Sequence, residues 1–366
     1  MAKPGLSQDD AKATNVTVAG TGPEADAWVR ALRGIDGVTA ERLPGATEDE
    51  LLENLSRGGI DAVAFVSAVA DLPGVVKRAM MARRDVLVAG PIALSSKQLL
   101  AIDDLARRRE RVTLFDTGSL GDERLTFVRK MTGGHQALWR TRYVRSLRTG
   151  AHGRGTLDEL AIADIATVLS IAGGLPSFVS AVAPRVDDET GAEDVAMVTL
   201  SFDGGPVARV DVSLVEPALR QEIVVACDGR SVVLDALDAR APLQIQASAR
   251  HRGPQQGGTW TETVSEHPVG NTGDRLTNAA MAFVTAIRKR DFAATNAREI
   301  ASAALVWETA RESISRGGEQ RALVDSPLAQ APRPELQLIH GGGHRSDAAP
   351  PELTLVGGRR SSATRQ

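Results

Sequence analysis

The residues with the clearest chemical meaning form the run Gly20-Thr21-Gly22-Pro23-Glu24-Ala25. This run follows a short apolar, β-rich segment, residues 15–19, and opens a helical one. The first glycine permits a tight turn, the second lets the backbone approach a pyrophosphate, and Ala25 allows close packing of helix on sheet. The helix N-terminus offers N–H groups and a positive dipole end to an anion. Glycines also follow strands for turn geometry alone. The position of the run nevertheless predicts a nucleotide phosphate site formed by Gly20, Thr21, Gly22 and Pro23.

The residues that would select the nucleotide are ambiguous. An acidic residue about twenty positions after the glycines binds a ribose 2′-hydroxyl, whereas an arginine suits a 2′-phosphate. Glu41 and Arg42 stand side by side at that position. Two solvated residues on a short edge strand explain the pair equally well. The sequence therefore predicts NAD or NADP as cofactor without choosing between them.

The elements around the glycine run alternate between strand and helix. Strands are predicted at 15–19, 38–43, 60–67, 85–89 and 111–115, with helices between them that include 48–56 and one running from Ser96 to about Arg109. Continuous apolar strands separated by helices indicate a parallel sheet covered on both faces. We therefore expect a flexible N-terminus over 1–14 and a doubly wound α/β, Rossmann-like domain over 15–133.

The second half of the chain has a different pattern. Its strands come at hairpin spacing, with turns at Asp203-Gly204-Gly205 and Asp228-Gly229-Arg230. Helices are predicted at 157–172, 274–290 and 296–316, and residues 250–273 read as a loop with room for an edge strand. This pattern favours an α+β domain over 134–330 with an open, mainly antiparallel sheet. The Pro-, Gly- and Ser-rich segment 331–366 predicts a disordered tail.

Composition excludes several classes of protein. The chain is 42% hydrophobic and 24% charged, which is typical of a folded, soluble protein. Its length of 366 residues exceeds what one hydrophobic core usually organises. A net charge of −3 and 3% aromatic residues argue against nucleic-acid binding. The longest uncharged stretch, 165–184, is broken at Gly173-Gly174-Leu175-Pro176, which argues against a membrane span. A single cysteine and a polar N-terminus predict a cytoplasmic protein.

From Val16 to about Val324, the chain resembles the Gfo/Idh/MocA family, which includes glucose–fructose oxidoreductase and inositol dehydrogenase. The resemblance rests on three stretches: IDAVAFVSAVADLPGVVKRAMMARRDVLVAGPIALS from Ile60, VTLFDTGSLGDERLTFVRKM from Val112, and GRGTLDELAIADIATVLSIAGG from Gly153. It implies NAD(P)-dependent oxidation of a sugar or polyol hydroxyl. It also implies a homo-oligomer in which the open sheet of the second domain faces another subunit.

Two catalytic positions implied by the resemblance are not retained. The family places a lysine in a Glu-Lys-Pro motif, where this chain has Ala89-Gly90-Pro91, so Gly90 stands in the place of the lysine. The family also has an Asp-x-x-x-His pair on the helix at 157–172. Counted from Asp164, Glu159 matches the aspartate and Ala163 the histidine, and the alternative register with Asp158 places an isoleucine there. Neither register restores the imidazole.

Three other groups remain as catalytic candidates. They are Glu159, Asp116 at the end of the last predicted Rossmann strand, and His152 in the loop before the helix. A solvated loop position explains His152 more readily than a catalytic one. At supporting positions, Ser67 keeps a hydroxyl where relatives have a Thr-Pro pair, and we expect it near the cofactor. Thr117-Gly118 replaces an Asn-Arg pair.

Three hypotheses remain open on these residues. The favoured one is a protein that binds NAD(P) or a sugar-like ligand without ordinary dehydrogenation, as a sensor, a regulatory protein or the partner subunit of another protein. The second is an active oxidoreductase with a rearranged proton relay. The third is a structural dimer module with a vestigial nucleotide site. The sequence does not identify a substrate.

Overall fold

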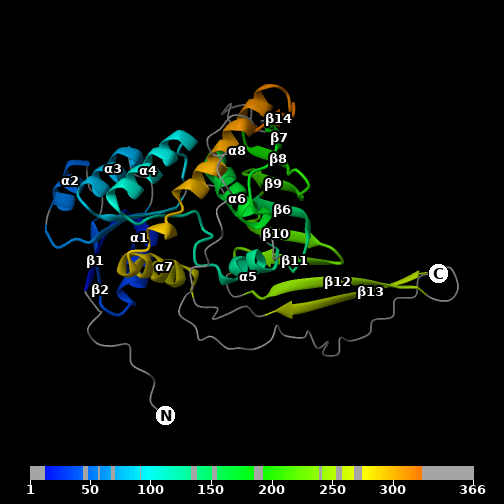
Figure 1. The fold of residues 1–366 in the computed structure, drawn as a ribbon, viewed down its shortest axis with the longest axis horizontal. Helices are drawn as coiled ribbons and strands as arrows, with labels where there is room; N and C mark the ends of the chain where they lie inside the picture. Colours follow the sequence, from blue (N-terminus) through cyan, green and yellow to red (C-terminus); the bar gives the residue numbers. More distant parts are fainter. Residues whose placement is uncertain are drawn as a thin grey trace, which may run out of the picture.

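The computed structural model describes residues 13–43, 48–56, 58–66, 71–90, 92–132, 138–150, 155–184, 193–238, 241–252, 258–267 and 274–323. Within these ranges the chain forms two bodies, each built on one sheet (Figure 1). The predicted boundary at 133/134 and the predicted tail, 331–366, lie outside the described residues. Thr14 already belongs to the first strand, so that strand begins one residue earlier than predicted.

The first body is a parallel sheet covered on both faces, which confirms the predicted Rossmann-like architecture. Its strands run in the order β2-β1-β3-β4-β5. They are β1 (Thr14–Ala19), β2 (Val38–Leu43), β3 (Ala62–Val66), β4 (Asp85–Ala89) and β5 (Thr113–Asp116). Every residue of β3 and β4 is buried, because α2 (Glu48–Ser56), α3 (Leu72–Met81) and α4 (Ser96–Arg109) pack on one face and α1 (Gly22–Arg33) on the other. Ser95 and Gln98 form a capping box at the start of α4.

A helix from the end of the chain completes this body. Helix α7 (Arg275–Lys289) lies beside α1 (Figure 1), and Phe283 and Ile287 share a core with Trp28 and Leu32. The α1 face of the sheet would otherwise expose apolar side chains to water. The first body therefore depends on residues that follow the second one in sequence.

The second body is an open sheet of nine strands, in the order β13-β12-β11-β10-β6-β9-β8-β7-β14. The β6–β9 pair is parallel and the other pairs are antiparallel, as predicted for an open, mainly antiparallel sheet. The strands are β6 (Thr141–Thr149), β7 (Phe178–Val182), β8 (Val195–Ser201), β9 (Val207–Ser213), β10 (Arg220–Cys227), β11 (Arg230–Asp235), β12 (Leu243–Arg252), β13 (Gly258–His267) and β14 (Arg321–Ala322). Helix α6 (Leu157–Ala172) and helix α8 (Ala297–Ser315) cover one face, and α5 (Glu123–Thr132) precedes them.

The segment 250–273 was expected to be a loop with room for an edge strand, and it contains one, because β13 is the edge strand of the nine-stranded sheet. The strand β12 was not predicted, and β12 and β13 form a hairpin in continuous register from Leu243–His267 to Arg252–Gly258. Strand β11 pairs with β12 only at residues 244–247, so the hairpin extends beyond the rest of the sheet (Figure 1). Its polar, Gly-rich composition is typical of a loop, whereas neighbouring strands supply the backbone hydrogen bonds that make it a sheet.

Helix α8 fixes the two bodies relative to each other. The Asn296 side chain accepts a hydrogen bond from the Phe115 amide at 2.8 Å and donates one to the Phe115 carbonyl at 2.9 Å, so it pairs with the free edge of β5. Just beyond the middle of the helix, the Glu308 carboxylate accepts bonds from the Ser96 amide at 2.8 Å and the Ser96 hydroxyl at 2.7 Å. It thereby caps α4 from the other body.

Candidate functional site

The glycine loop has the geometry that an anion site requires. Thr21, the N-cap of α1, is extended (φ −121°, ψ 162°) and makes no side-chain capping hydrogen bond. Gly22 adopts φ +79°, a conformation that favours glycine, and a Cβ added there would meet no atom within 4 Å. Thr21, Gly22 and Pro23 are exposed. The loop therefore leaves open space at an uncapped helix N-terminus, which fits a pyrophosphate.

The end of β2 is hydrogen-bonded to this loop. The Gly20 amide donates to the Leu43 carbonyl at 3.4 Å, and Arg42 Nε donates to the Gly20 carbonyl at 3.4 Å. Arg42 also forms an ion pair with Asp26 of α1, at 2.5 Å between Nη1 and Oδ1. The neighbouring residue Glu41 is exposed. Arg42 is thus held by a carboxylate and a carbonyl, whereas the Glu41 carboxylate faces solvent.

The end of β4 carries no side chain that could move a proton. Gly90 follows β4 with φ +113°, and its amide donates to the Asp116 carbonyl at 3.1 Å. A Cβ at Gly90 would meet no atom within 4 Å, so space is not what limits this position. The backbone conformation is the constraint, because residues with a side chain rarely adopt it. The position where the resemblance implies a lysine therefore has both a glycine and a backbone conformation that favours glycine.

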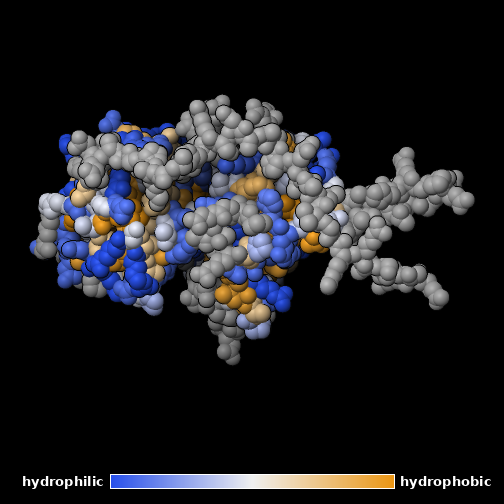
Figure 2. Space-filling view, turned by 90° about the horizontal axis from the view of Figure 1, so that it is seen from below, coloured by the Kyte–Doolittle hydropathy of each residue, from blue (hydrophilic) through white to orange (hydrophobic). Residues whose placement is uncertain are grey.

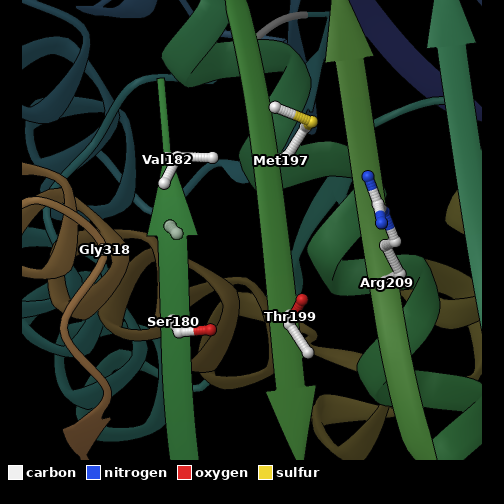
Figure 3. A pocket seen from close by; sticks show the side chains of 7 residues that line it. Ser180, Val182, Met197, Thr199, Arg209 and Gly318 are labelled. Atoms are coloured by element: carbon white, nitrogen blue, oxygen red, sulfur yellow. The ribbon is translucent and has the colours of Figure 1, made fainter. Parts of the chain in front are cut away.

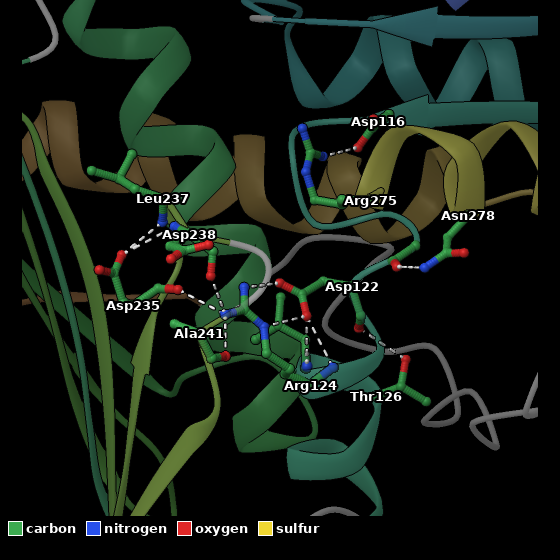
Figure 4. A network of polar contacts seen from close by, with 12 residues as sticks. Asp116, Asp122, Arg124, Thr126, Asp235, Leu237, Asp238, Ala241, Arg275 and Asn278 are labelled. Carbon is green, nitrogen blue, oxygen red and sulfur yellow. Dashed lines mark hydrogen bonds and ion pairs between the residues drawn. The ribbon is translucent and has the colours of Figure 1, made fainter. Parts of the chain in front are cut away.

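Asp116, at the end of β5, organises the loop that follows the strand. Its Oδ1 accepts hydrogen bonds from the Gly118 amide at 2.9 Å and the Leu120 amide at 3.2 Å, and it lies 3.5 Å from Arg275 Nη1 of α7 (Figure 4). Burial raises the pKa of the Asp116 carboxyl, and the nearby Arg275 charge and the two amides oppose that rise. The predicted candidate is therefore a buried carboxyl, 4% exposed, at the expected strand end.

A second network beside this loop was not predicted. The Arg124 guanidinium is paired with Asp122 at 2.8 Å and donates to three carbonyls, those of Asp235 at 3.0 Å, Asp238 at 2.6 Å and Ala241 at 3.1 Å (Figure 4). Both charged side chains are buried. The network ties α5 to the connection between β11 and β12. No local sequence pattern predicts this network, because the carbonyls that accept from Arg124 belong to residues more than a hundred positions later.

Glu159, the catalytic candidate on α6, takes part in the N-terminal cap of its own helix. The Glu159 carboxylate accepts a hydrogen bond from the Thr156 amide at 2.7 Å, and the Glu159 amide donates to the Thr156 hydroxyl at 3.3 Å. This is a capping box. Ala163, which the sequence resemblance aligns with the family histidine, is 7% exposed. Asp164 is paired with Arg148 through two hydrogen bonds, at 2.6 and 2.9 Å.

Two predicted residues, Ser67 and His152, lie outside the described residues. Among the residues that the structure does describe, no group of three or more His, Cys, Asp or Glu side chains could hold a metal ion. In the same part of the chain, no helix has the length and apolar character that a membrane crossing requires.

A hollow on the second body lies away from the strand ends described above. It is on the face of the nine-stranded sheet opposite α6 and is lined by Ser180, Val182, Met197, Thr199, Arg209 and Gly318 (Figure 3). Arg209 in this hollow is paired with Asp211 of the same strand. Exposed apolar side chains stand on two of the strands that line the hollow, Phe178 and Val182 on β7 and Val207 on β9. On the face that Figure 2 shows, hydrophobic residues form separate patches among hydrophilic ones.

Comparison with known proteins agrees with this architecture. Residues 113–233 match the family model described as the GFO/IDH/MocA C-terminal domain. The predicted resemblance to the Gfo/Idh/MocA family is confirmed. No curated protein sequence matches the chain.

Solved structures with the same fold share little sequence with this chain. An oxidoreductase from Pseudomonas syringae has a TM-score of 0.68 at 16% identity, covering 85% of this chain and 99% of its own. GenD2 from gentamicin A biosynthesis, in complex with NAD, has 0.67 at 16%, covering 88% and 99%. An inositol dehydrogenase homologue from Azotobacter vinelandii, in complex with NADH and myo-inositol, has 0.67 at 15%, covering 85% and 98%. At these identities the likeness shows the fold.

Proposed function

We propose that this chain is a Gfo/Idh/MocA-like protein that binds NAD(H) but does not carry out lysine-assisted dehydrogenation, and that it acts as a sensor, a regulatory protein or the partner subunit of another protein. One observation carries the proposal. The glycine loop keeps an open cradle for a pyrophosphate, whereas Gly90 presents no side chain at the strand end where the family has its lysine.

The cofactor would be held by the first turn of α1. The backbone of Gly20, Thr21, Gly22 and Pro23 faces the space that a pyrophosphate requires, and similar structures contain NAD or NADH. When bound, the nicotinamide ring supplies the hydride acceptor or donor. A 2′-phosphate would need the Arg42 guanidinium, whose charge is neutralised by the ion pair with Asp26. Glu41 is exposed, so its carboxylate is available to accept a hydrogen bond from a ribose hydroxyl. This arrangement supports NAD over NADP.

The proton relay is the missing part. Oxidation of a hydroxyl requires a group that takes its proton as the hydride leaves. Gly90 and Ala163 have no such group, and Glu159 is committed to the cap of α6. A sugar-like ligand could therefore occupy the site without being oxidised at the rate of a working dehydrogenase.

A second function, an active oxidoreductase with Asp116 as the relay, is supported by the position of that carboxyl. It lies at the end of a parallel strand, where doubly wound folds bind their ligands. Its raised pKa brings it closer to the range of a useful general base. Its two amide contacts and its salt bridge with Arg275 favour the structural role instead.

The open face of the second sheet supports self-association. Phe178 and Val207 are exposed on it, at 41% and 45%, and apolar side chains there would be buried between two facing sheets. A homodimer or larger assembly is the proposed state, and light scattering at micromolar protein measures it. A monomeric mass would contradict this proposal.

Calorimetric titration with NADH and NADPH tests the cofactor proposal. Wild-type protein should bind NADH, and Gly22→Asp should abolish binding, because its carboxylate would meet the phosphates. Gly204→Asp is the matched control, since Gly204 also has a positive φ and open space but lies in a distant hairpin. Wild type that binds neither dinucleotide at millimolar concentration would favour a vestigial site. A redox screen over sugars and polyols then separates the two functions.

A further inference from the structure

The opposite end of the parallel sheet carries a dense group of cations. There, at the N-terminal ends of the strands, helices α1, α3, α4 and α7 all end. We call this surface the basic edge and define it by Arg30, Arg33, Arg83, Arg84, Arg108, Arg109, Arg111, Arg288, Lys289 and Arg290. A cation in the last turn of a helix is favourable because it faces the negative end of the dipole. That preference accounts for one or two cations at each helix end, and this edge has more.

Hydrogen bonds place the four helix ends next to one another. Arg288, at the end of α7, donates to the Asp36 carbonyl just after α1 at 2.6 Å. Arg290 donates to the Glu110 carbonyl at the end of α4 at 2.7 Å. Arg111, after α4, donates to the Arg83 carbonyl after α3 at 3.1 Å. The cations therefore form one continuous surface across the sheet edge.

About half of these cations are used by the fold. Arg33 and Arg84 donate to backbone carbonyls, as Arg111, Arg288 and Arg290 do, and Arg290 also neutralises the buried carboxylate of Asp85. The side chains of the others make no hydrogen bond or ion pair with any residue that the structure describes: Arg30, Arg83, Arg108, Arg109 and Lys289. All five side chains are exposed. They outnumber the exposed acidic residues in the same turns, Asp36 and Glu110, in a chain whose net charge is −3.

The positive charges at this edge act on each other. Burial lowers the pKa of the Arg111 guanidinium, and repulsion from Arg290 and Arg83 lowers it further, against the attraction of Asp85 and Glu110. Accumulated like charge destabilises the folded chain unless an anion neutralises it. The arrangement therefore points to an anionic binding partner.

We propose that the basic edge is a docking surface for an acidic, Asp- and Glu-rich segment of a partner protein. Its size fits such a segment, because five strands about 4.8 Å apart give an edge roughly 20 Å wide, the length of about six extended residues. Arginine forks pair with carboxylates through two parallel hydrogen bonds. The surplus of acidic residues elsewhere on the chain would repel a longer polyanion that runs past this edge.

Other polyanionic surfaces fit the edge less well. Nucleic-acid strands are bound with the help of aromatic side chains on which bases stack. The aromatic ring at this edge, Phe292, is covered on one face by the Arg290 guanidinium, 4.8 Å from the ring centre. A membrane surface would require apolar side chains that insert, and Met81 is the exposed large apolar residue at these helix ends.

The basic edge and the glycine loop lie at opposite ends of the same strands. Strands β1 to β5 are parallel, so their N-terminal ends share one edge and the glycine loop follows the other. A partner at the basic edge would leave the nucleotide site accessible. This inference does not depend on cofactor binding, and its test uses neither NAD(H) nor a redox substrate.

Fluorescence anisotropy with a fluorescein-labelled hexaglutamate peptide tests the proposal on the full chain. At about 50 mM salt the wild type should bind the peptide saturably, with affinity falling as salt rises, because screening shortens the range of the charges. Arg108→Glu/Arg109→Glu should raise the Kd at least about tenfold, which corresponds to 1.4 kcal/mol. Arg140→Glu/Arg220→Glu, which changes two exposed cations of the other body, should leave it within about twofold of wild type.

Circular dichroism and thermal unfolding verify that both double variants are folded. Absence of saturable peptide binding by the wild type would overturn the proposal, as would equal losses in the two variants. Tighter binding of a hexathymidylate strand, or of vesicles containing phosphatidylserine, than of the peptide would also overturn it. Those results would assign the basic edge to another class of anion.

Discussion

The carboxylate of Glu159 accepts a hydrogen bond from the backbone N–H of Thr156 at 2.7 Å, and the Thr156 hydroxyl accepts one in return from the Glu159 amide at 3.3 Å. Glu159, which the sequence resemblance aligns with an aspartate of the Gfo/Idh/MocA family, is thus half of a capping box. Its carboxylate satisfies a backbone donor that would otherwise remain without a partner at the start of α6.

Substitution of Glu159 should therefore change stability rather than chemistry. Glu159→Gln keeps an oxygen that can accept from Thr156, so its unfolding free energy should stay within about 0.5 kcal/mol of wild type. Glu159→Ala loses the cap and should cost about 0.5–2 kcal/mol. Urea unfolding measures both. A Gln variant as unstable as the Ala variant would show that the charge, not the cap, matters.

Placing a lysine at position 90 should strain the backbone. Gly90 has φ +113°, and forcing a side chain into such a conformation costs about 1–3 kcal/mol. Gly90→Lys should be destabilised by that amount and should gain no dehydrogenase activity, because Ala163 supplies no partner for the relay. Gly90→Ala is the control, since it carries the same strain without the amine. If Gly90→Lys and Gly90→Ala are both as stable as wild type, the backbone argument fails.

The buried carboxyl of Asp116 should make stability depend on pH with a defined sign. Its folded-state pKa is raised above the ordinary value of 3.8 by burial, against the opposing Arg275 charge and the Gly118 and Leu120 amides. A raised pKa means that the folded chain binds this proton more tightly than the unfolded chain does. The contribution is therefore fully present below pH 3.8 and is lost as pH rises through the folded-state pKa.

Comparison with Asp116→Asn isolates that dependence. The asparagine oxygen can still accept from the Gly118 and Leu120 amides but does not titrate. The stability of wild type relative to the variant should therefore fall as pH rises from 4 towards 7, as measured by urea unfolding at each pH. A difference that grows with pH would mean that the Arg275 charge outweighs burial and that the folded-state pKa is lowered.

The ion pair between Arg42 and Asp26 should influence cofactor choice. Asp26→Asn removes the carboxylate that neutralises Arg42 and should let this guanidinium contact a 2′-phosphate. An exposed pair of this kind is worth about 0.5–1 kcal/mol, so the ratio of the NADPH Kd to the NADH Kd should fall about two- to fivefold. Asp104→Asn, an exposed carboxylate on α4, is the control. An unchanged ratio would place the ribose away from Arg42.

Local signals were sufficient to predict many of the elements. Ser95 caps the start of α4, Asp274 caps α7 through the Leu276 amide, and the glycine run lies at the first β–α junction as expected. These features depend on residues within a few positions of each other. The doubly wound sheet follows from them because parallel strands need helical crossovers.

Long-range partners explain what the sequence did not predict. Asp116 was expected at a strand end, but Arg275, which opposes the rise of its pKa, lies far along the chain. Arg124 binds carbonyls of a connection beyond β11, and no spacing indicates that contact. The φ of Gly90 is likewise set by the surrounding fold. The sequence was sufficient to name residues that could take part in catalysis. It was not sufficient to predict which of them form structural contacts instead.

Hydride transfer by the wild-type protein is the most direct test of the central claim. NADH absorbance is followed with NAD⁺ and a panel of sugars and polyols, and in reverse with their keto forms, at dinucleotide concentrations shown by calorimetry to saturate the site. A proton relay contributes about 10²–10⁴-fold to such reactions. The account predicts a rate at least that far below a working dehydrogenase, unchanged by Glu159→Gln and Asp116→Asn. Robust turnover that is lost in either variant would contradict it and establish an oxidoreductase with a rearranged relay.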